Sequence, residues 1–260
     1  MKKLALTSLM AVFAVSAANA AAINDNPLYR PTEGMFYSVT SLESHSKATT
    51  DWAATERFGY GVTDKLAIGL ETSASQKNWF DQSSWDDFGI GLSYRVMEMN
   101  GWMVDLTGSY GVGPIMPYGG SFLDKNDTTY VWTVGAQVGK EMGNLTLAGH
   151  VAFDYVNSES FNWGDDGMHQ IRLGADAFLA LNDNWGLVGG VEYAGITDDD
   201  INGVKIENAG TWTGTVGVNY NFCDDTFVGA YVGREMAHTG AGAWETRPGF
   251  TFGAKFGAQF

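Results

Sequence analysis

The last stretch of the chain, FTFGAKFGAQF at residues 250–260, decides the fold. Its phenylalanines and alanines occupy every second position, and Lys255 stands among the small and polar residues between them. Because successive side chains of a β-strand point to opposite faces, this period of two predicts a strand with one apolar and one polar face. A charge in the middle of the polar face, and none on the apolar face, suits a strand whose apolar side meets lipid.

The same alternation recurs along the chain, as in LAIGLETS at 66–73, FGIGLSYR at 88–95 and IRLGADAFL at 171–179. Counting such segments predicts about twelve strands, an even number typical of single-chain bacterial barrels. The expected strands lie near residues 34–42, 52–61, 65–75, 86–96, 102–112, 129–139, 145–156, 168–180, 185–195, 210–221, 226–236 and 248–260.

Short and long connections alternate between these segments. The short ones are rich in Asn, Asp or Gly, which suit tight turns, and lie at 62–64, 98–100, 142–144, 182–184 and 223–225. The long ones lie at 43–51, 76–85, 113–128, 157–167, 196–209 and 237–247. Short periplasmic turns and long external loops predict an all-β fold over 34–260, a closed antiparallel up-and-down transmembrane β-barrel of about 12 strands.

Aromatic residues gather towards the ends of the expected strands, where rings with an apolar body and a polar tip settle at the level of lipid headgroups. This favours an aromatic girdle over the core aromatics of an ordinary β protein. The expected girdle residues are Tyr37, Trp52, Tyr60, Trp102, Tyr110, Tyr130, Trp132, Trp185, Tyr193, Trp212 and Tyr220.

The N-terminus indicates export. Lys2 and Lys3 precede an apolar stretch at 4–15, and Ala18-Asn19-Ala20 places small residues at the positions that a signal peptidase reads. This order predicts a signal peptide at 1–20, cleaved after Ala20. Residues 21–33 are then expected to form a short periplasmic lead into the first strand.

The charge of the chain excludes one class of partner. The formal net charge is −15, and about −17 once Lys2 and Lys3 leave with the signal peptide. Nucleic acid is therefore not an expected partner, since its phosphates require Lys and Arg. Cys223 is the only cysteine, so no internal disulfide can form, and we expect an idle thiol.

A terminal Phe260 that closes an alternating strand with Phe256 resembles the C-terminal signature of Gram-negative outer-membrane β-barrel proteins. The resemblance is one of topology over roughly 34–260 and indicates no subfamily. It implies insertion by the barrel-assembly machinery, and lipid and lipopolysaccharide as surroundings. Twelve-stranded relatives include solute channels, autotransporter translocators and an outer-membrane phospholipase.

If the alternation holds, charged residues collect on the inner face, because Arg or Lys facing lipid at mid-membrane costs about 2–4 kcal/mol. Two interpretations stay open: ion pairs that fill and rigidify the barrel, or a polar constriction that selects solutes by charge. Arg234 and Glu235 occupy opposite faces, which a bulge or an early end of the membrane band would explain. The lumen-lining candidates are Arg57, Glu71, Asp87, Arg95, Asp105, His150, Asp154, Arg172, Asp176, Glu192 and Lys255.

The sequence offers little for catalysis, cofactors or metals. His150 and Asp154 stand four positions apart on one strand, about 13 Å between Cα atoms, which is too far for a hydrogen-bonded pair. His169 is expected to face outward, without the serine and asparagine that the phospholipase resemblance would require. The acidic loop segments 165–166 and 198–200 lack the spacing of a helix-loop-helix calcium site.

Two functions remain. The leading hypothesis is a passive, porin-like channel for small solutes with a charged lumen. The alternative is a non-conducting structural or surface-interaction barrel that acts through its extracellular loops. The sequence does not separate them, because closure of the lumen depends on how its arginines reach across to its carboxylates.

Overall fold

The computed structural model describes residues 26–46, 52–77, 82–115, 128–158, 167–197, 200–201, 204–205, 209–223, 225–238, 245–246 and 249–260. The predicted signal peptide at 1–20, the acidic pair at 165–166 and residues 198–199 lie outside this part of the chain.

Twelve long strands build the molecule, and the twelve predicted strands are confirmed. They are β1 (Phe36–His45), β2 (Trp52–Gly61), β3 (Leu66–Lys77), β4 (Gln82–Met99), β5 (Trp102–Gly113), β6 (Thr129–Met142), β7 (Leu145–Ser158), β8 (Met168–Ala180), β9 (Trp185–Ile196), β12 (Gly210–Cys223), β13 (Thr226–His238) and β15 (Thr251–Gln259). Three two-residue strands were not predicted: β10 (Asp200–Ile201), β11 (Val204–Lys205) and β14 (Glu245–Thr246).

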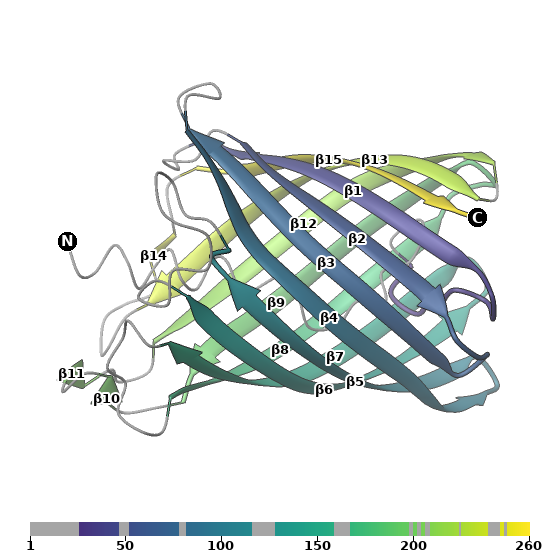
Figure 1. Ribbon diagram of the computed structural model, residues 1–260. Helices are drawn as coiled ribbons and strands as arrows, with labels where there is room; N and C mark the ends of the chain where they lie inside the picture. Colours follow the sequence, from purple (N-terminus) through teal and green to yellow (C-terminus); the bar gives the residue numbers. More distant parts are fainter. Residues whose placement is uncertain are drawn as a thin grey trace.

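The sheet closes on itself. Long strands that follow one another in the chain pair antiparallel, and β15 completes the circle by pairing with both β13 and β1. Phe36 and Phe260 exchange backbone hydrogen bonds of 2.8 and 2.9 Å at this seam. Figure 1 shows the tilted strands wrapped around a common axis, with the C-terminal end at one end of the barrel and β10, β11 and β14 towards the other.

The largest departure from the predicted boundaries is β4, which extends well beyond 86–96 at both ends. Its pairing shifts register at Ser73/Ala74 against β3 and at Arg95/Met97 against β5. An extra residue in one strand breaks the alternation locally, so the period-two pattern could not be followed through these points. The turn between β4 and β5 is tight, since Asn100 and Gly101 both have positive φ, as a two-residue hairpin of mirror-image type requires.

The outer and inner faces differ as the alternation predicts. Large apolar side chains such as Leu92, Val134 and Phe252 are exposed on the outside. The inside is packed in part by a cluster of Tyr37, Val39 and Phe227. No helix in the described part of the chain is long and apolar enough to cross a membrane.

The structure corrects one of the predicted girdle residues. Pairs of rings meet near strand ends, as Tyr110 does with Trp132 at 4.5 Å and Trp185 with Tyr220 at 4.8 Å between centroids. Tyr37, however, points inward and is 2% exposed. It follows Phe36, which takes the outward position, and its ring lies over Gly59, where a Cβ would come 1.9 Å from the ring.

Candidate functional site

The candidate site is the lumen of the barrel. Because outward apolar residues fix the orientation of each strand, the positions between them face inward. All of the predicted lumen candidates occupy such inward positions: Arg57, Glu71, Asp87, Arg95, Asp105, His150, Asp154, Arg172, Asp176, Glu192 and Lys255.

Arg234 and Glu235 do lie on opposite faces, as their adjacent positions require. The pairing of β12 with β13 runs through both residues without a shift, so this ladder does not contain the bulge that was one of the two explanations. Arg234 faces outward with its guanidinium 4.9 Å from the ring centroid of Phe250, near the end of β13 that leads into a long connection. This position agrees with the other explanation, an early end of the membrane band.

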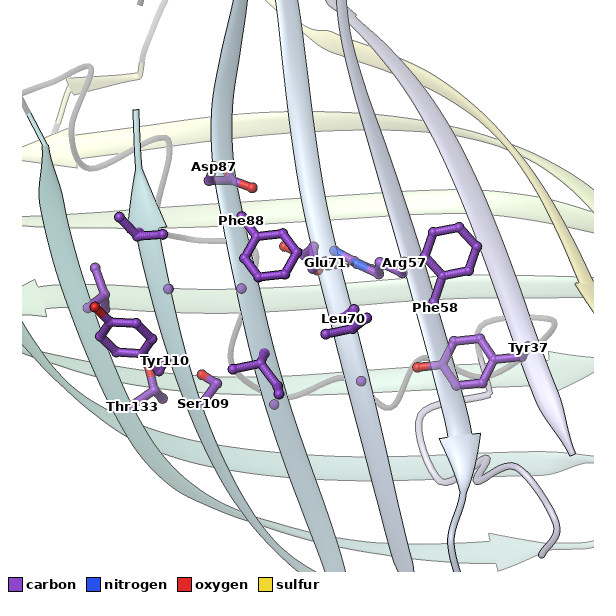
Figure 2. Close-up of a pocket in the computed structure, with 17 residues that line it drawn as sticks. Tyr37, Arg57, Phe58, Leu70, Glu71, Asp87, Phe88, Ser109, Tyr110 and Thr133 are labelled. Carbon is purple, nitrogen blue, oxygen red and sulfur yellow. Dashed lines mark hydrogen bonds and ion pairs between the residues drawn. The ribbon is translucent and has the colours of Figure 1, made fainter. Parts of the chain in front are cut away.

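One part of the inner wall is lined by glycine. Gly69, Gly89, Gly91 and Gly111 face inward on three neighbouring strands, and an added Cβ at each would find its nearest neighbour no closer than 3.5 Å. The open space against this wall measures about 680 Å³ (Figure 2). Absent side chains, rather than a gap in the sheet, create this space.

Charged groups border that space. Arg57 on β2 donates from Nε to Glu71 on β3 at 2.5 Å, and both side chains are 19% exposed. Asp87 lies beyond Glu71 and accepts a 2.5 Å hydrogen bond from the Ser73 hydroxyl (Figure 2). The wall of the space thus presents one cation beside two carboxylates.

A second cluster joins β6, β7 and β8. Arg172 donates from two nitrogens to the carboxylate of Asp154 at 2.7 and 2.8 Å, and Thr133 donates its hydroxyl to the same group at 2.6 Å. The side chains of Arg172 and Asp154 are only 2% and 1% exposed. This ion pair is therefore closed off from solvent and forms part of the barrel wall.

A third cluster centres on His150 of β7. Its ring nitrogens lie 3.2 Å from a carboxylate oxygen of Asp176 and 3.1 Å from one of Glu192. Three strands are therefore tied together by one imidazole. Opposite charges that line a lumen in this way can both hold the wall and attract solute ions.

The remaining candidate is Lys255 of β15, which lies on the inward face beside β13. Its Nζ lies 4.8 Å from the ring centroid of Tyr231, whose hydroxyl donates to Glu43 of β1. Glu43 and Tyr231 were not among the predicted residues. They extend the charged lining to the seam where the sheet closes.

The segment before β1 also belongs to the site, because it crosses the mouth at the short-turn end. Tyr29 donates its hydroxyl to Gln259 of β15 and packs edge-on against Tyr37, at 6.3 Å between centroids. Leu28 is buried against Met103 of β5 and Ala148 of β7. The strands contacted by Tyr29 and by Leu28 lie on opposite sides of the barrel, so residues 26–31 span its mouth from one wall to the other.

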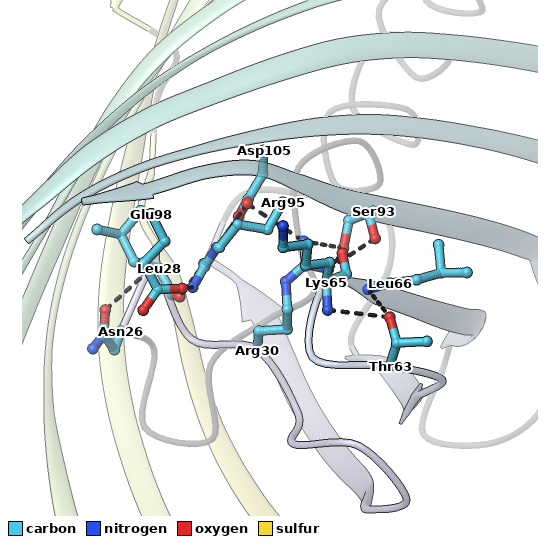
Figure 3. A network of polar contacts seen from close by, with 10 residues as sticks. All are labelled: Asn26, Leu28, Arg30, Thr63, Lys65, Leu66, Ser93, Arg95, Glu98 and Asp105. Carbon is cyan, nitrogen blue, oxygen red and sulfur yellow. Dashed lines mark hydrogen bonds and ion pairs between the residues drawn. The ribbon is translucent and has the colours of Figure 1, made fainter.

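Arg30 and Arg95 anchor this segment (Figure 3). Arg30 donates to the backbone oxygens of Lys65 and Ser93, and lies 3.4 Å from Asp105. Arg95 makes a two-pronged contact with Asp105 at 2.9 and 3.1 Å and donates to the backbone oxygen of Leu28 at 2.8 Å. A charged network on the wall thus holds the backbone of the segment.

The protonation of the segment fits these contacts. Burial raises the pKa of Tyr29 above its ordinary value, so its phenol stays neutral and can donate to Gln259. Burial lowers the pKa of Arg30, an effect that the neighbouring Asp105 carboxylate opposes.

Some residues of the site could be predicted from the alternation only in part. Arg95 and Asp105 lie on the inward face, but nothing in the period-two pattern indicates that a segment outside the strands pairs with them. Leu28, Tyr29 and Arg30 belong to no alternating strand, and their partners are distant in sequence. Only packing in three dimensions reveals the crossing.

His150 and Asp154, which the sequence places too far apart for a hydrogen-bonded pair, have separate partners. His150 contacts Asp176 and Glu192, whereas Asp154 is held by Arg172. His169 stacks on the rings of Phe153 and Tyr155 at 5.5 and 5.4 Å, on the outer face as predicted.

In the described part of the chain, no three His, Cys, Asp or Glu side chains are placed to hold a metal ion. Cys223 is exposed at the end of β12 as a free thiol.

Comparison with known proteins supports the architecture. No family model and no curated sequence matches the chain. Among solved structures, the chain resembles an outer membrane channel from Pseudomonas putida F1, with 14% identity, TM-score 0.55, and 89% of this chain and 97% of the other covered.

The KdgM porin shares 8% identity at TM-score 0.58 over 86% of this chain and 99% of its own. The NanC porin shares 11% identity at TM-score 0.58 over 86% of this chain and 98% of its own. At these identities the likeness concerns the fold, which is that of outer-membrane barrels.

Proposed function

We propose that this chain is a passive, porin-like channel of the outer membrane for small hydrophilic solutes, and that its charged lumen selects among them. The observation that carries the proposal is the open space against the glycine-lined wall inside a closed barrel. Structures with the same fold that are named as porins or channels support this proposal.

The sign of the lumen charge favours cations. Carboxylates on the inward face outnumber the cationic groups there, and rings of carboxylates favour cation passage. The inward acids in the described strands include Glu43, Glu71, Asp87, Glu98, Asp105, Glu141, Asp154, Asp176, Glu192 and Glu235. The cations are Arg57, Arg95, Arg172 and Lys255, with Arg30 from the crossing segment.

Export and assembly belong to the same proposal. The signal peptide at 1–20 would direct the chain out of the cytoplasm, and Phe256 and Phe260 would present the outward face that the barrel-assembly machinery reads. Lipid and lipopolysaccharide would then surround the apolar band. No catalytic step is proposed, since the charged groups of the lumen are engaged with one another.

Recording from planar bilayers tests the proposal. Purified protein should give discrete conductance steps, and a salt gradient should give a reversal potential of the sign that cation preference requires. Gly91→Leu adds a side chain to the inner wall and should lower the conductance. Gly214→Leu is the matched control, because Gly214 faces outward and an added Cβ there meets nothing within 4 Å.

The crossing segment, residues 26–31, lies across the mouth and can by itself reduce conductance, so a variant without it is also recorded. If the full chain and a variant lacking residues 26–31 both give no conductance steps, the channel proposal fails and the non-conducting barrel acting through its loops is favoured. If Gly91→Leu and Gly214→Leu change the conductance equally, the glycine wall does not line the path.

A further inference from the structure

The guanidinium group of Arg30 lies against the barrel wall at the short-turn end (Figure 3). Its Nη1 donates to the backbone oxygens of Lys65 and Ser93, the second at 2.9 Å. Its Nη2 donates to the Ser93 hydroxyl at 3.1 Å and lies 3.4 Å from a carboxylate oxygen of Asp105. We call these four acceptors the Arg30 seat: the backbone oxygens of Lys65 and Ser93, the Ser93 hydroxyl and the Asp105 carboxylate.

The geometry of the Arg30 seat suits a guanidinium group better than an ammonium group. Two nitrogens of one planar group each face two acceptors, so the donors must point in fixed directions from two atoms. An ammonium group carries its three donors on a single nitrogen, and the seat has four acceptors. The seat therefore recognises the shape of its occupant as well as its charge.

The wall keeps its own contacts when Arg30 leaves. Arg95 binds the Asp105 carboxylate through two hydrogen bonds of 2.9 and 3.1 Å, so this carboxylate stays paired. The backbone oxygen of Lys65 also accepts from the backbone amide of Arg95 at 2.8 Å. A buried ion pair is costly to break chiefly because a charge is left uncompensated. Departure of Arg30 leaves no such charge in the wall.

Arg30 itself fits the seat imperfectly. Its side chain is only 5% exposed, yet its Nε is buried and has no hydrogen-bond partner among the described residues. A buried donor without a partner is unfavourable. The guanidinium of Arg95 also lies against the same carboxylate, so two cations share one anion. An arginine that leaves the seat regains water at all of its donors, which makes this contact reversible.

We propose that the Arg30 seat is a binding site for solutes that carry a guanidinium group, and that Arg30 occupies it in their place. A solute that takes the seat displaces Arg30 and releases the crossing segment from the mouth. Leu28, which is buried against Met103 and Ala148, then leaves its pocket. The inference rests on the proposed channel, for which it names a class of solute, and the excess of inward carboxylates attracts such cations.

Labelling of a cysteine beneath the crossing segment tests this displacement. In a Cys223→Ser background, Ala148→Cys lies under Leu28 and should react slowly with a water-soluble maleimide. Methylguanidinium chloride should raise this rate several-fold, whereas tetramethylammonium chloride, which has no N–H donor, should not. Ala152→Cys is the matched control: it replaces an inward alanine on the same strand that is 3% exposed, and neither salt should change its rate.

Replacements of Arg30 test the seat. Arg30→Gln removes the guanidinium and should raise the labelling rate of Ala148→Cys about tenfold without any solute, because hydrogen bonds from a charged group are lost. Arg30→Lys keeps the charge but should behave like Arg30→Gln, since one nitrogen cannot serve the seat. Arg234→Gln is the matched control: it removes an outward arginine near the other end of the barrel and should leave the rate unchanged.

Four results would overturn the proposal: equal effects of the two salts, no effect of either, or a native labelling rate in Arg30→Gln or in Arg30→Lys. Heat-dependent gel mobility checks that each variant has folded, and Met103→Cys replaces Ala148→Cys if the latter does not fold. Labelling requires no ion flow, so these outcomes do not depend on conductance. The channel proposal fails separately, when neither the full chain nor the variant lacking residues 26–31 gives conductance steps.

Discussion

The buried pair of Arg172 and Asp154 gives the sharpest stability prediction. Replacing Arg172 by methionine leaves Asp154 with the Thr133 hydroxyl but without its cation, in a site where that carboxylate is 1% exposed. Breaking a buried pair by removing one partner costs about 3–5 kcal/mol. Arg57→Met breaks the pair with Glu71, which is 19% exposed and borders the open space, so it should cost about 1 kcal/mol or less.

Equilibrium unfolding in urea measures this difference. The barrel would be folded into lipid vesicles, and the fluorescence of its nine tryptophans would report the transition. The double replacement Arg172→Met with Asp154→Leu should recover most of the loss, because no uncompensated charge remains. Equal costs for Arg172→Met and Arg57→Met, or no recovery in the double variant, would show that the buried pair does not act as argued.

Three further predictions follow from the lumen. Gly59→Ala should destabilise the barrel by about 1–3 kcal/mol in the same urea assay, because the new Cβ would overlap the buried ring of Tyr37. Lys255→Gln should shift the reversal potential in a salt gradient further towards cation preference, since it removes an inward cation, and an unchanged potential would place Lys255 away from the ion path. Leu28→Asp should loosen the crossing segment, because burial of an uncompensated carboxylate beside Met103 is unfavourable; conductance should rise, and an unaltered conductance would show that the segment does not limit flow.

The fold could be predicted from the sequence because the strands and short turns of a membrane barrel each require a local pattern of residues. Each strand needs apolar residues at alternate positions, and each short turn needs Asn, Asp or Gly, so the twelve long strands were predicted from neighbouring residues alone. The period-two pattern did not predict the bounds of a strand where the register shifts, as at Ser73/Ala74 in the pairing of β3 with β4. Tyr37 was misassigned because an aromatic residue near a strand end suits either face.

The candidate site was predicted less completely, for a physical reason. Alternation shows that a side chain points inward, but not which group it meets across the lumen. Arg95 and Asp105 lie within one hairpin, so their pairing needs only the register of two adjacent strands. The contact of Arg95 with the Leu28 backbone joins residues far apart in sequence, and no local pattern encodes it.

Glu56 and Arg234 show how depth decides the meaning of a charge on the outer face. Arg234 lies near the end of β13, where a long side chain can reach the headgroup level, so it needs no protein partner. Glu56 lies midway along β2 on a shorter side chain, and its next neighbour Arg57 already points to the opposite face. The cost of a charge in lipid, which predicted the inward arginines, thus also explains why Glu56 accepts hydrogen bonds from the Ser38 and Thr40 hydroxyls, whereas Arg234 needs no such donors.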